Sequence, residues 1–205
     1  MNKIYKVFPG GKFKVLTFSY DDGKIEDRRL VKLFNKYNLK ATFNLNTGII
    51  DPAIRIPQEE WPELYAGHDI AVHTFTHPTM IRLNDYAVIR EILEDKNNLE
   101  KIFHRPITGF AYPNGSFDSR IVDIAKSVGI KYARVTNDRY AATKAAENYA
   151  SSADGPIPIG DENGFFMPDD YMRWVPTCHH NHNLIDFGKK FMALTKKQYL
   201  YMMYV

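Results

Sequence analysis

The sequence predicts an α/β fold built from parallel strand–helix units, and three observations lead to this prediction. Short apolar runs rich in β-branched and aromatic residues alternate with stretches that carry apolar residues at helical spacing. A chain of 205 residues with 44% hydrophobic and 25% charged residues can bury one large core. No internal repeat or low-complexity run interrupts the alternation. We therefore expect one domain over residues 1–205, arranged as a barrel or a doubly wound sheet.

The first half of the chain predicts three strands and two helices. The strands are apolar runs, FKVLTFSY, KATFNLN and HDIAVHT, at residues 13–20, 40–46 and 68–74. The stretch IEDRRLVKLFNKYN at residues 25–38 has the apolar spacing of an amphipathic helix. A shorter helix is expected at residues 57–67, because PQEEWPELYAG begins with proline and acidic residues and ends in glycine.

The second half continues the alternation and then breaks it. A long helix is expected to begin at Asn84 as its N-cap, and a later one to stop at Gly129. Residues 137–170 are rich in Gly, Pro, Asp and Asn and predict an irregular excursion. The other expected elements are helices at 83–104, 119–129 and 183–196, and strands at 107–112, 130–136 and 198–205.

Charge and cysteine usage exclude several classes of partner. The net charge is +3 and the pI about 8.8, with basic and acidic residues interspersed, so no nucleic-acid partner is expected. Cys178 is the single cysteine, which rules out an internal disulfide and fits a reducing compartment. Neither the first residues nor any later segment resembles a signal peptide or a membrane span. The expected location is the cytoplasm, unless Met1 is not the natural start.

Two histidines four residues apart, in AVHTFTHPTM at residues 71–80, make this segment a candidate metal site. Neutral imidazole is a common ligand for zinc and similar ions. His73 and His77 would share a face on a helix and also on a strand, so spacing alone leaves open that they end a strand and face water.

Other polar motifs fall at the same edge of the predicted sheet. In parallel βα architectures, ligands bind beyond the carboxyl ends of the strands. Asp21 and Asp22 follow the first strand, the histidine pair follows the third, and AYPNG ends the fourth. This convergence favours the interpretation of the histidines as a metal site.

The stretch SYDDG supplies carboxylates that the histidines lack. Asp-Asp-Gly is also a common turn sequence, but two adjacent carboxylates repel each other unless a cation lies nearby. One aspartate can complete a set of two imidazoles and one carboxylate that leaves metal positions open. The other can act as a general base, and Gly23 lets the backbone turn without filling the pocket.

These residues resemble the motifs of the polysaccharide deacetylases, the NodB-like or family 4 carbohydrate esterases. SYDDG is similar to Thr-Phe-Asp-Asp-Gly, HTFTH matches His-(Ser/Thr)-x-x-His, and the resemblance extends from about Lys14 to Arg134. It implies a distorted, incomplete (β/α) barrel of NodB type that binds Zn²⁺ or, alternatively, Co²⁺, Mn²⁺ or Ni²⁺. It also implies that the general base is Asp21 and that the metal ligands are Asp22, His73 and His77.

The resemblance implies a metal-dependent hydrolase that removes N-acetyl or O-acetyl groups from a carbohydrate. The third motif, usually Arg-x-Pro-Tyr, is altered, because Ala111 replaces the arginine and Asn114 the tyrosine. The main-chain N–H of Asn114 can still bind an oxyanion, with Tyr112 and Pro113 beside the substrate. Arg134 or Arg173 could take over the arginine's task of orienting the base. Two alternatives stay open: an amidohydrolase on a small non-sugar amide, and a non-catalytic sugar-binding protein that retains metal.

The cluster TCHHNHN raises two further questions. Cys178, His180 and His182 could form a second metal site, although a structural zinc normally has four ligands, so a polar loop at the pocket rim is the favoured interpretation. The family's general acid is a histidine that follows the final strand, and this chain stops at Val205. We therefore expect either that the chain is truncated or that His179 or His180 supplies the acid.

Overall fold

Seven parallel strands form one sheet in the computed structural model, which describes residues 8–12, 14–136, 165, 168, 170–180, 183–194 and 199–204. The strand order is β5-β4-β3-β2-β1-β7-β6. The strands are β1 (Lys14–Asp21), β2 (Ala41–Leu45), β3 (Asp69–Val72), β4 (Gly109–Ala111), β5 (Tyr132–Arg134), β6 (Cys178–His179) and β7 (Tyr199–Tyr204). Six of these were predicted, whereas β6 lies in the segment expected to be a polar loop. Most of the predicted excursion at 137–170 lies outside the described residues.

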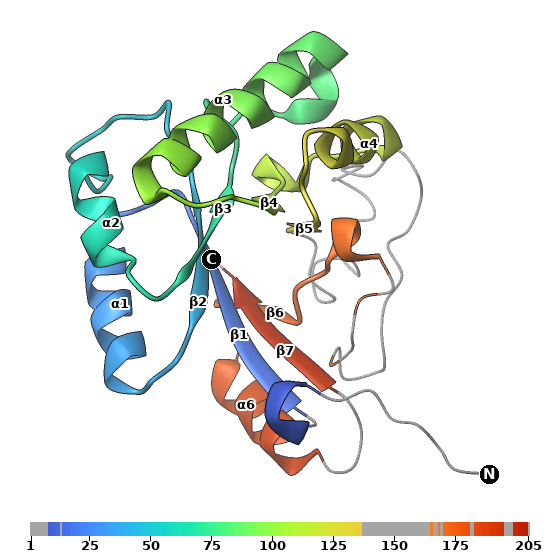
Figure 1. The fold of residues 1–205 in the computed structure, drawn as a ribbon. Helices are drawn as coiled ribbons and strands as arrows, with labels where there is room; N and C mark the ends of the chain where they lie inside the picture. Colours follow the sequence, from blue (N-terminus) through green and yellow to red (C-terminus); the bar gives the residue numbers. More distant parts are fainter. Residues whose placement is uncertain are drawn as a thin grey trace.

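Helices lie around the outside of the strands (Figure 1). They are α1 (Asp27–Lys36), α2 (Trp61–Leu64), α3 (Asp85–Phe103), α4 (Ser119–Ser127) and α6 (Leu184–Ala193). Short 3-10 turns are η1 (Pro9–Gly11), η2 (Gln58–Glu60), η3 (Met80–Arg82), η4 (Pro113–Gly115) and η5 (Tyr171–Arg173). No helix in the described ranges is long and apolar enough to span a bilayer.

Local signals place the helix ends. The Asn84 side chain caps α3 by accepting a hydrogen bond from the Ala87 N–H at 2.9 Å. Asp118 caps α4 in the same way. Gly129 adopts a φ of 87° after α4, a left-handed conformation that glycine reaches without steric cost. The predicted N-cap and the predicted stop are therefore both confirmed.

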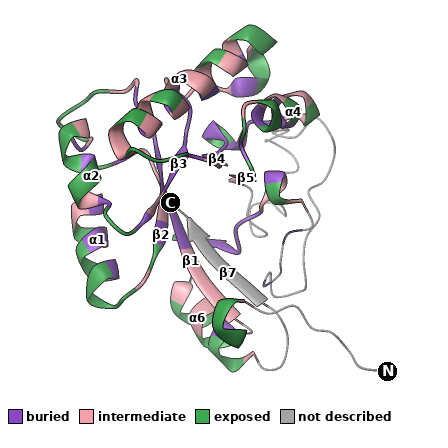
Figure 2. Ribbon diagram, viewed as in Figure 1, coloured by how far each residue is buried: buried purple, intermediate pink, exposed green. Residues whose placement is uncertain are grey.

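Each helix buries one stripe of residues against the strands. In Figure 2 the helices surround largely buried strands, and the outer faces of the helices are exposed. In α1 the buried stripe is Asp27, Val31 and Phe34. Leu33 and Tyr37, two further apolar residues of the stretch predicted to be an amphipathic helix, are 40% and 61% exposed. The difference arises because the stripe follows the i, i+4, i+7 positions that face β1 and β2, and two apolar residues fall outside it.

The sheet curls until its two edges are joined by one segment of chain. At one edge, Trp174 pairs with Arg134 of β5, where the Trp174 N–H donates to Ala133 at 2.9 Å. A few residues later, β6 pairs with β7. The fold is thus the distorted, incomplete (β/α) barrel that the resemblance implied, and not a doubly wound sheet. Because all strands are parallel, their carboxyl ends meet at one end of the barrel.

Candidate active site

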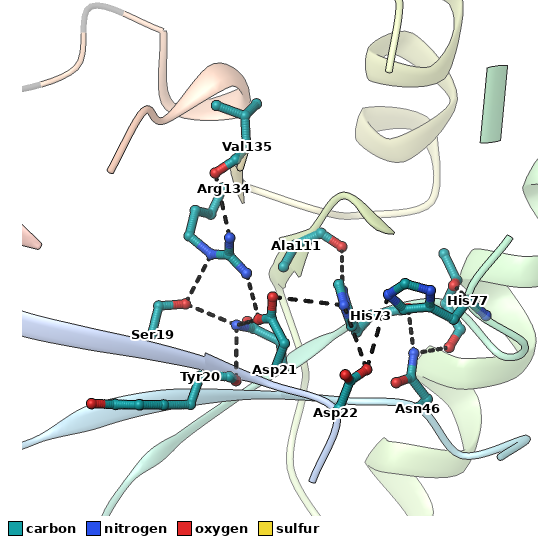
Figure 3. Close-up of polar contacts among 12 residues, drawn as sticks. Ser19, Tyr20, Asp21, Asp22, Asn46, His73, His77, Ala111, Arg134 and Val135 are labelled. Carbon is teal, nitrogen blue, oxygen red and sulfur yellow. Dashed lines mark hydrogen bonds and ion pairs between the residues drawn. The ribbon is translucent and has the colours of Figure 1, made fainter. Parts of the chain in front are cut away.

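The polar motifs predicted from the sequence meet at the carboxyl ends of the strands. Asp21 is the last residue of β1 and pairs in register with Asn44 of β2. His73 directly follows β3, and Ala111 and Arg134 end β4 and β5. Figure 3 shows the side chains of Asp21, Asp22, His73 and His77 pointing toward one another.

Asp22, His73 and His77 form the one trio of metal-ligating side chains that the structure brings together among its described residues. One ligand atom from each lies within 4.8 Å of the others. The Nε2 atoms of His73 and His77 lie 4.0 and 3.9 Å from Asp22 Oδ1. That oxygen is buried and accepts no hydrogen bond, although Arg55 Nη1 lies 3.3 Å away. A buried carboxylate oxygen facing two imidazole nitrogens fits a divalent cation, so the residues present suit the metal that the motifs imply.

The backbone holds the His73 ring in the orientation that ligation needs. Nδ1 lies 2.8 Å from the carbonyl oxygen of Ala111, so we assign the proton to Nδ1 and the lone pair to Nε2. Burial lowers the pKa of His73, and the neighbouring Asp21 only partly opposes this. The neutral form, which is the ligating form, is therefore favoured.

Backbone strain is present at three non-glycine residues in and between the members of the metal-ligating trio. Asp22, Thr74 and His77 have φ values of 81°, 67° and 56°, in the left-handed region. Such residues cost about 1–3 kcal/mol each and persist where the surrounding structure holds them. Two of them are members of the metal-ligating trio, which links the strain to the geometry of the site.

Asp21 lies beside the trio and is held by a different set of donors. Arg134 Nη2 and Asn44 Nδ2 both donate to its Oδ1, the latter at 2.8 Å. Its Oδ2 lies 3.8 Å from His73 Nε2. Burial alone would raise the pKa of Asp21, but the Arg134 guanidinium outweighs it, with help from His73 and Asn44, and the pKa lies below its ordinary value. Asp21 is therefore ionised and can accept a proton.

The structure distinguishes between the two arginines that the sequence left open. Arg134 contacts Asp21 and also donates from Nε to the Ser19 hydroxyl at 3.1 Å. Arg173 donates to Ser119 at 2.9 Å and to Asp170 at 3.5 Å. The arginine beside the carboxylate is thus Arg134.

Two further residues at the site were missed by sequence reasoning. Arg55 donates to the main-chain oxygen of Asp22 and, at 3.2 Å, to Asn46 Oδ1. Asn46 in turn donates to the carbonyl oxygens of His73 and Thr74 at 2.5 and 2.9 Å. Asn46 is the last residue of the strand predicted at 40–46, so the strand-end argument could have found it, whereas nothing in the local sequence marks Arg55.

The residues of AYPNG occupy β4 and the turn η4 that follows it. Tyr112 is fully buried, its ring stacks on Phe117 with centroids 4.9 Å apart, and its hydroxyl donates to Met172 at 3.0 Å. Pro113 is buried too, and Asn114 has a φ of 55°. The side chain of Tyr112 therefore belongs to the core and is not available to a ligand.

His179 lies at the carboxyl end of β6, paired with Tyr204 of β7, which pairs with Ser19 of β1. This register puts His179 at the same end of the barrel as the aspartates. The ring of His180 is 4.0 Å from that of His179. Cys178 is buried in the core, and His182 lies outside the described residues, so the second metal site stays a prediction.

Comparisons with known proteins agree with the motifs. A family model described as polysaccharide deacetylase matches residues 9–133. A putative polysaccharide deacetylase, YxkH of Bacillus subtilis, is 25% identical over 140 residues, which are 67% of this chain and 50% of that protein.

Solved structures show the same fold. A Streptococcus pyogenes deacetylase, PplD, in complex with acetate superimposes with a TM-score of 0.59 at 25% identity, over 63% of this chain and 58% of that one. A polysaccharide deacetylase of Bacillus cereus, BC0361, gives a TM-score of 0.62 at 20% identity, over 84% of this chain and 50% of that one.

This chain spans only part of the length of such relatives, 50% for YxkH and 37% for another Bacillus subtilis protein, YlxY. The family model nevertheless covers more than half of the chain, from before β1 into β5. That region contains Asp21, Asp22, His73 and His77. The chain therefore belongs to the polysaccharide deacetylase family.

Proposed function

We propose that this chain is a metal-dependent deacetylase that hydrolyses an N-acetyl or O-acetyl group on a carbohydrate. The observation that carries the proposal is the convergence of His73 and His77 on the buried Asp22 Oδ1, beside an ionised Asp21. A ligand set and a separate base are the two parts that hydrolysis of an unreactive amide requires.

Asp22, His73 and His77 would hold the metal, which we propose to be Zn²⁺, with Co²⁺, Mn²⁺ or Ni²⁺ as substitutes. When bound, it would polarise the acetyl carbonyl and lower the pKa of water. Three protein ligands leave coordination positions for water and substrate. The donation from His73 Nδ1 to Ala111 fixes the ring that would face it.

The chain's own residues supply the proton transfers and part of the charge stabilisation. Asp21 would take a proton from the attacking water, and the main-chain N–H of Asn114 would donate to the oxyanion. The main chain at Tyr112 and Pro113 would border the acetyl group. Expulsion of the amine needs a proton, which His179 or His180 would donate from the strand-end side of β6.

A pocket beside the site favours a second candidate, an amidohydrolase on a small non-sugar amide. Its volume is about 130 Å³, and Arg55, whose Nη1 contacts Asp22, is part of its wall. The rest of its lining combines aliphatic residues (Ile49, Ile50, Pro52, Ile56 and Pro57) with the polar residues Asp51, Gln58 and Glu59, and it contains no aromatic ring. Aliphatic side chains without an aromatic ring suit a compact apolar group better than a sugar ring.

Three variants test the assignment of roles. Asp21→Asn should retain the metal and lose turnover, because it removes a proton acceptor and not a ligand. Asp22→Asn and His77→Ala should each lower metal content about tenfold or more. Elemental analysis and an acetate-release assay measure the two effects separately. Equal metal loss in Asp21→Asn and Asp22→Asn, or near-normal kcat in Asp21→Asn, would refute the roles.

A second experiment measures hydrolysis of chito-oligosaccharides and of small cyclic amides by the same protein preparation. Acetate release from the sugars supports the main proposal, and hydrolysis of the cyclic amides alone supports the second candidate. Sugar binding without acetate release would identify a non-catalytic protein that keeps its metal, which is the role that the altered AYPNG motif would permit.

A further inference from the structure

Helix α3 contacts β3 and turns two carboxylates, one helical turn apart, toward the loops of the site. Glu91 accepts both the N–H and the hydroxyl of Thr76, at 2.8 and 2.7 Å. Asp95 accepts the same two groups of Thr47, at 2.7 and 2.8 Å. Carboxylates at positions i and i+4 of the helix therefore each bind the backbone N–H and the hydroxyl of a threonine in a different loop.

Asp95 joins the ends of two neighbouring strands. It is completely buried, and its Oδ2 accepts a hydrogen bond from the His73 N–H at 3.0 Å while Oδ1 holds Thr47. Thr47 follows β2, and His73 follows β3. Asn98, on the next turn of α3, donates to the Thr47 hydroxyl at 3.2 Å. One carboxylate thus fixes a metal-ligating residue relative to the adjacent strand.

Glu91 holds the other half of the histidine loop. Thr76 directly precedes His77, and the Phe75 N–H donates to the main-chain oxygen of Glu91 at 3.0 Å. Together with His73, three backbone amides of this five-residue loop are tied to α3. The loop holds left-handed conformations that residues other than glycine adopt only under constraint, and α3 provides that constraint.

We infer that Glu91 and Asp95 are positioning residues that set the metal affinity of the site by fixing the loop carrying His73 and His77. This inference rests on the proposed function, because it concerns the same ligands. Neither carboxylate belongs to the ligand trio, and both act through backbone N–H groups. A carboxylate accepts on both oxygens, whereas an amide of the same shape must place an NH₂ group against one donor.

The test measures Zn²⁺ affinity of the full chain by competition with a chromogenic chelator, at a temperature where circular dichroism shows each variant folded. Asp95→Asn and Glu91→Gln should each weaken Zn²⁺ binding by about tenfold or more, the effect typical of residues that orient ligands. The effect of Asp95→Asn should be the larger, because Asp95 is buried and contacts a ligand residue directly.

Two controls on the same helix separate positioning from general destabilisation. Glu94→Gln removes a carboxylate that pairs with Arg90 at 3.1 Å on the outer face of α3, and it should leave the affinity unchanged. Leu99→Val disturbs a fully buried apolar residue and should lower Tm while preserving the affinity. Weaker binding in the two carboxylate variants but in neither control supports the inference.

The results distinguish a failure of this inference from a failure of the proposed function. Zn²⁺ affinity within twofold of wild type in both Asp95→Asn and Glu91→Gln overturns this inference and leaves the proposed function intact. A loss in Leu99→Val as large as in Asp95→Asn also overturns it, since the effect is then one of stability. A wild-type chain that binds no Zn²⁺ overturns the proposed function and this inference with it.

Discussion

At the scale of single residues, the arginine missing from the AYPNG motif has a counterpart on the neighbouring strand. Ala111 and Arg134 are partners in the β4–β5 ladder. The arginine side chain therefore begins on the strand next to β4, at the same register position as Ala111. The small side chain at Ala111 leaves space, and the length of arginine covers the distance to Asp21. Asp21, the proposed base, therefore has a cationic partner although the AYPNG motif carries no arginine.

Replacing this arginine should move the acidic limb of the pH profile. Arg134→Met removes the main influence that opposes burial, so the pKa of Asp21 should rise. A base must be deprotonated to act, so activity should be lost at a higher pH on the acid side. The profile of kcat/KM against pH measures the shift, and metal content should stay unchanged.

Arg173→Met is the matched control, because that arginine contacts Ser119 and Asp170 instead. It should leave the acidic limb in place. An unchanged limb in Arg134→Met would show that Arg134 does not set the ionisation of the base.

At the scale of elements, the loop after β2 and the loop after β3 support each other. The Gly48 N–H donates to the carbonyl oxygen of Phe75 at 3.0 Å, in the middle of the histidine loop. Asn46, also from the segment after β2, donates to the two preceding carbonyls of that loop, those of His73 and Thr74. The geometry of the proposed metal ligands His73 and His77 therefore depends on close contact between the loop after β2 and the loop after β3.

Gly48→Ala should loosen the site. A methyl group at Gly48 would overlap the carbonyl oxygen of Phe75 and lie 2.8 Å from its ring, so one loop must move. We expect a loss of about 1–3 kcal/mol in the free energy of unfolding. Chemical denaturation measures this loss, and chelator competition should show weaker metal binding.

Gly188→Ala provides the opposite control, since nothing lies within 4 Å of the added methyl group and the residue is inside α6. It should stabilise the chain by roughly 0.5–1 kcal/mol. If Gly48→Ala and the wild type had the same free energy of unfolding, the two loops could move apart without loss of stability.

At the scale of the whole molecule, the join between β5 and the segment after η5 holds the arginine of the site. Arg134 is itself the residue that pairs with Trp174. The bond from the Val135 N–H to the Trp174 oxygen, at 3.0 Å, completes the join. Arg134 thus takes part both in the closure of the barrel and in the orientation of Asp21, the proposed base.

Hydrogen exchange tests this closure. The amides of Val135 and Trp174 should exchange as slowly as those in the β1–β2 ladder, with protection of roughly a thousandfold or more, because both are bonded across the join. Backbone NMR measures the rates. Exchange at the rate of an unstructured peptide at both amides would show that the barrel is open at this edge.

Patterns in the sequence alone predicted most helices and strands and the main candidate residues of the site. Strand and helix periods arise from each segment's need to bury one face, a property of neighbouring residues along the chain. The rule that parallel strands present their carboxyl ends together places SYDDG and HTFTH at one site. Patterns within short segments therefore predicted the parallel α/β class and the place of the site, whereas the choice of a barrel over a doubly wound sheet came from the family resemblance.

The hydrogen-bond and ion-pair partners of those residues are visible only in the tertiary structure. Arg134 lies 113 residues from Asp21 in the sequence, and Asp95 lies 22 from His73, so no local pattern connects either pair. The same holds for β6, a two-residue strand stabilised by its pairing with β7. Hydrogen bonds and ion pairs depend on distances of a few ångströms through space, and those distances exist only after the strands have curled into a barrel.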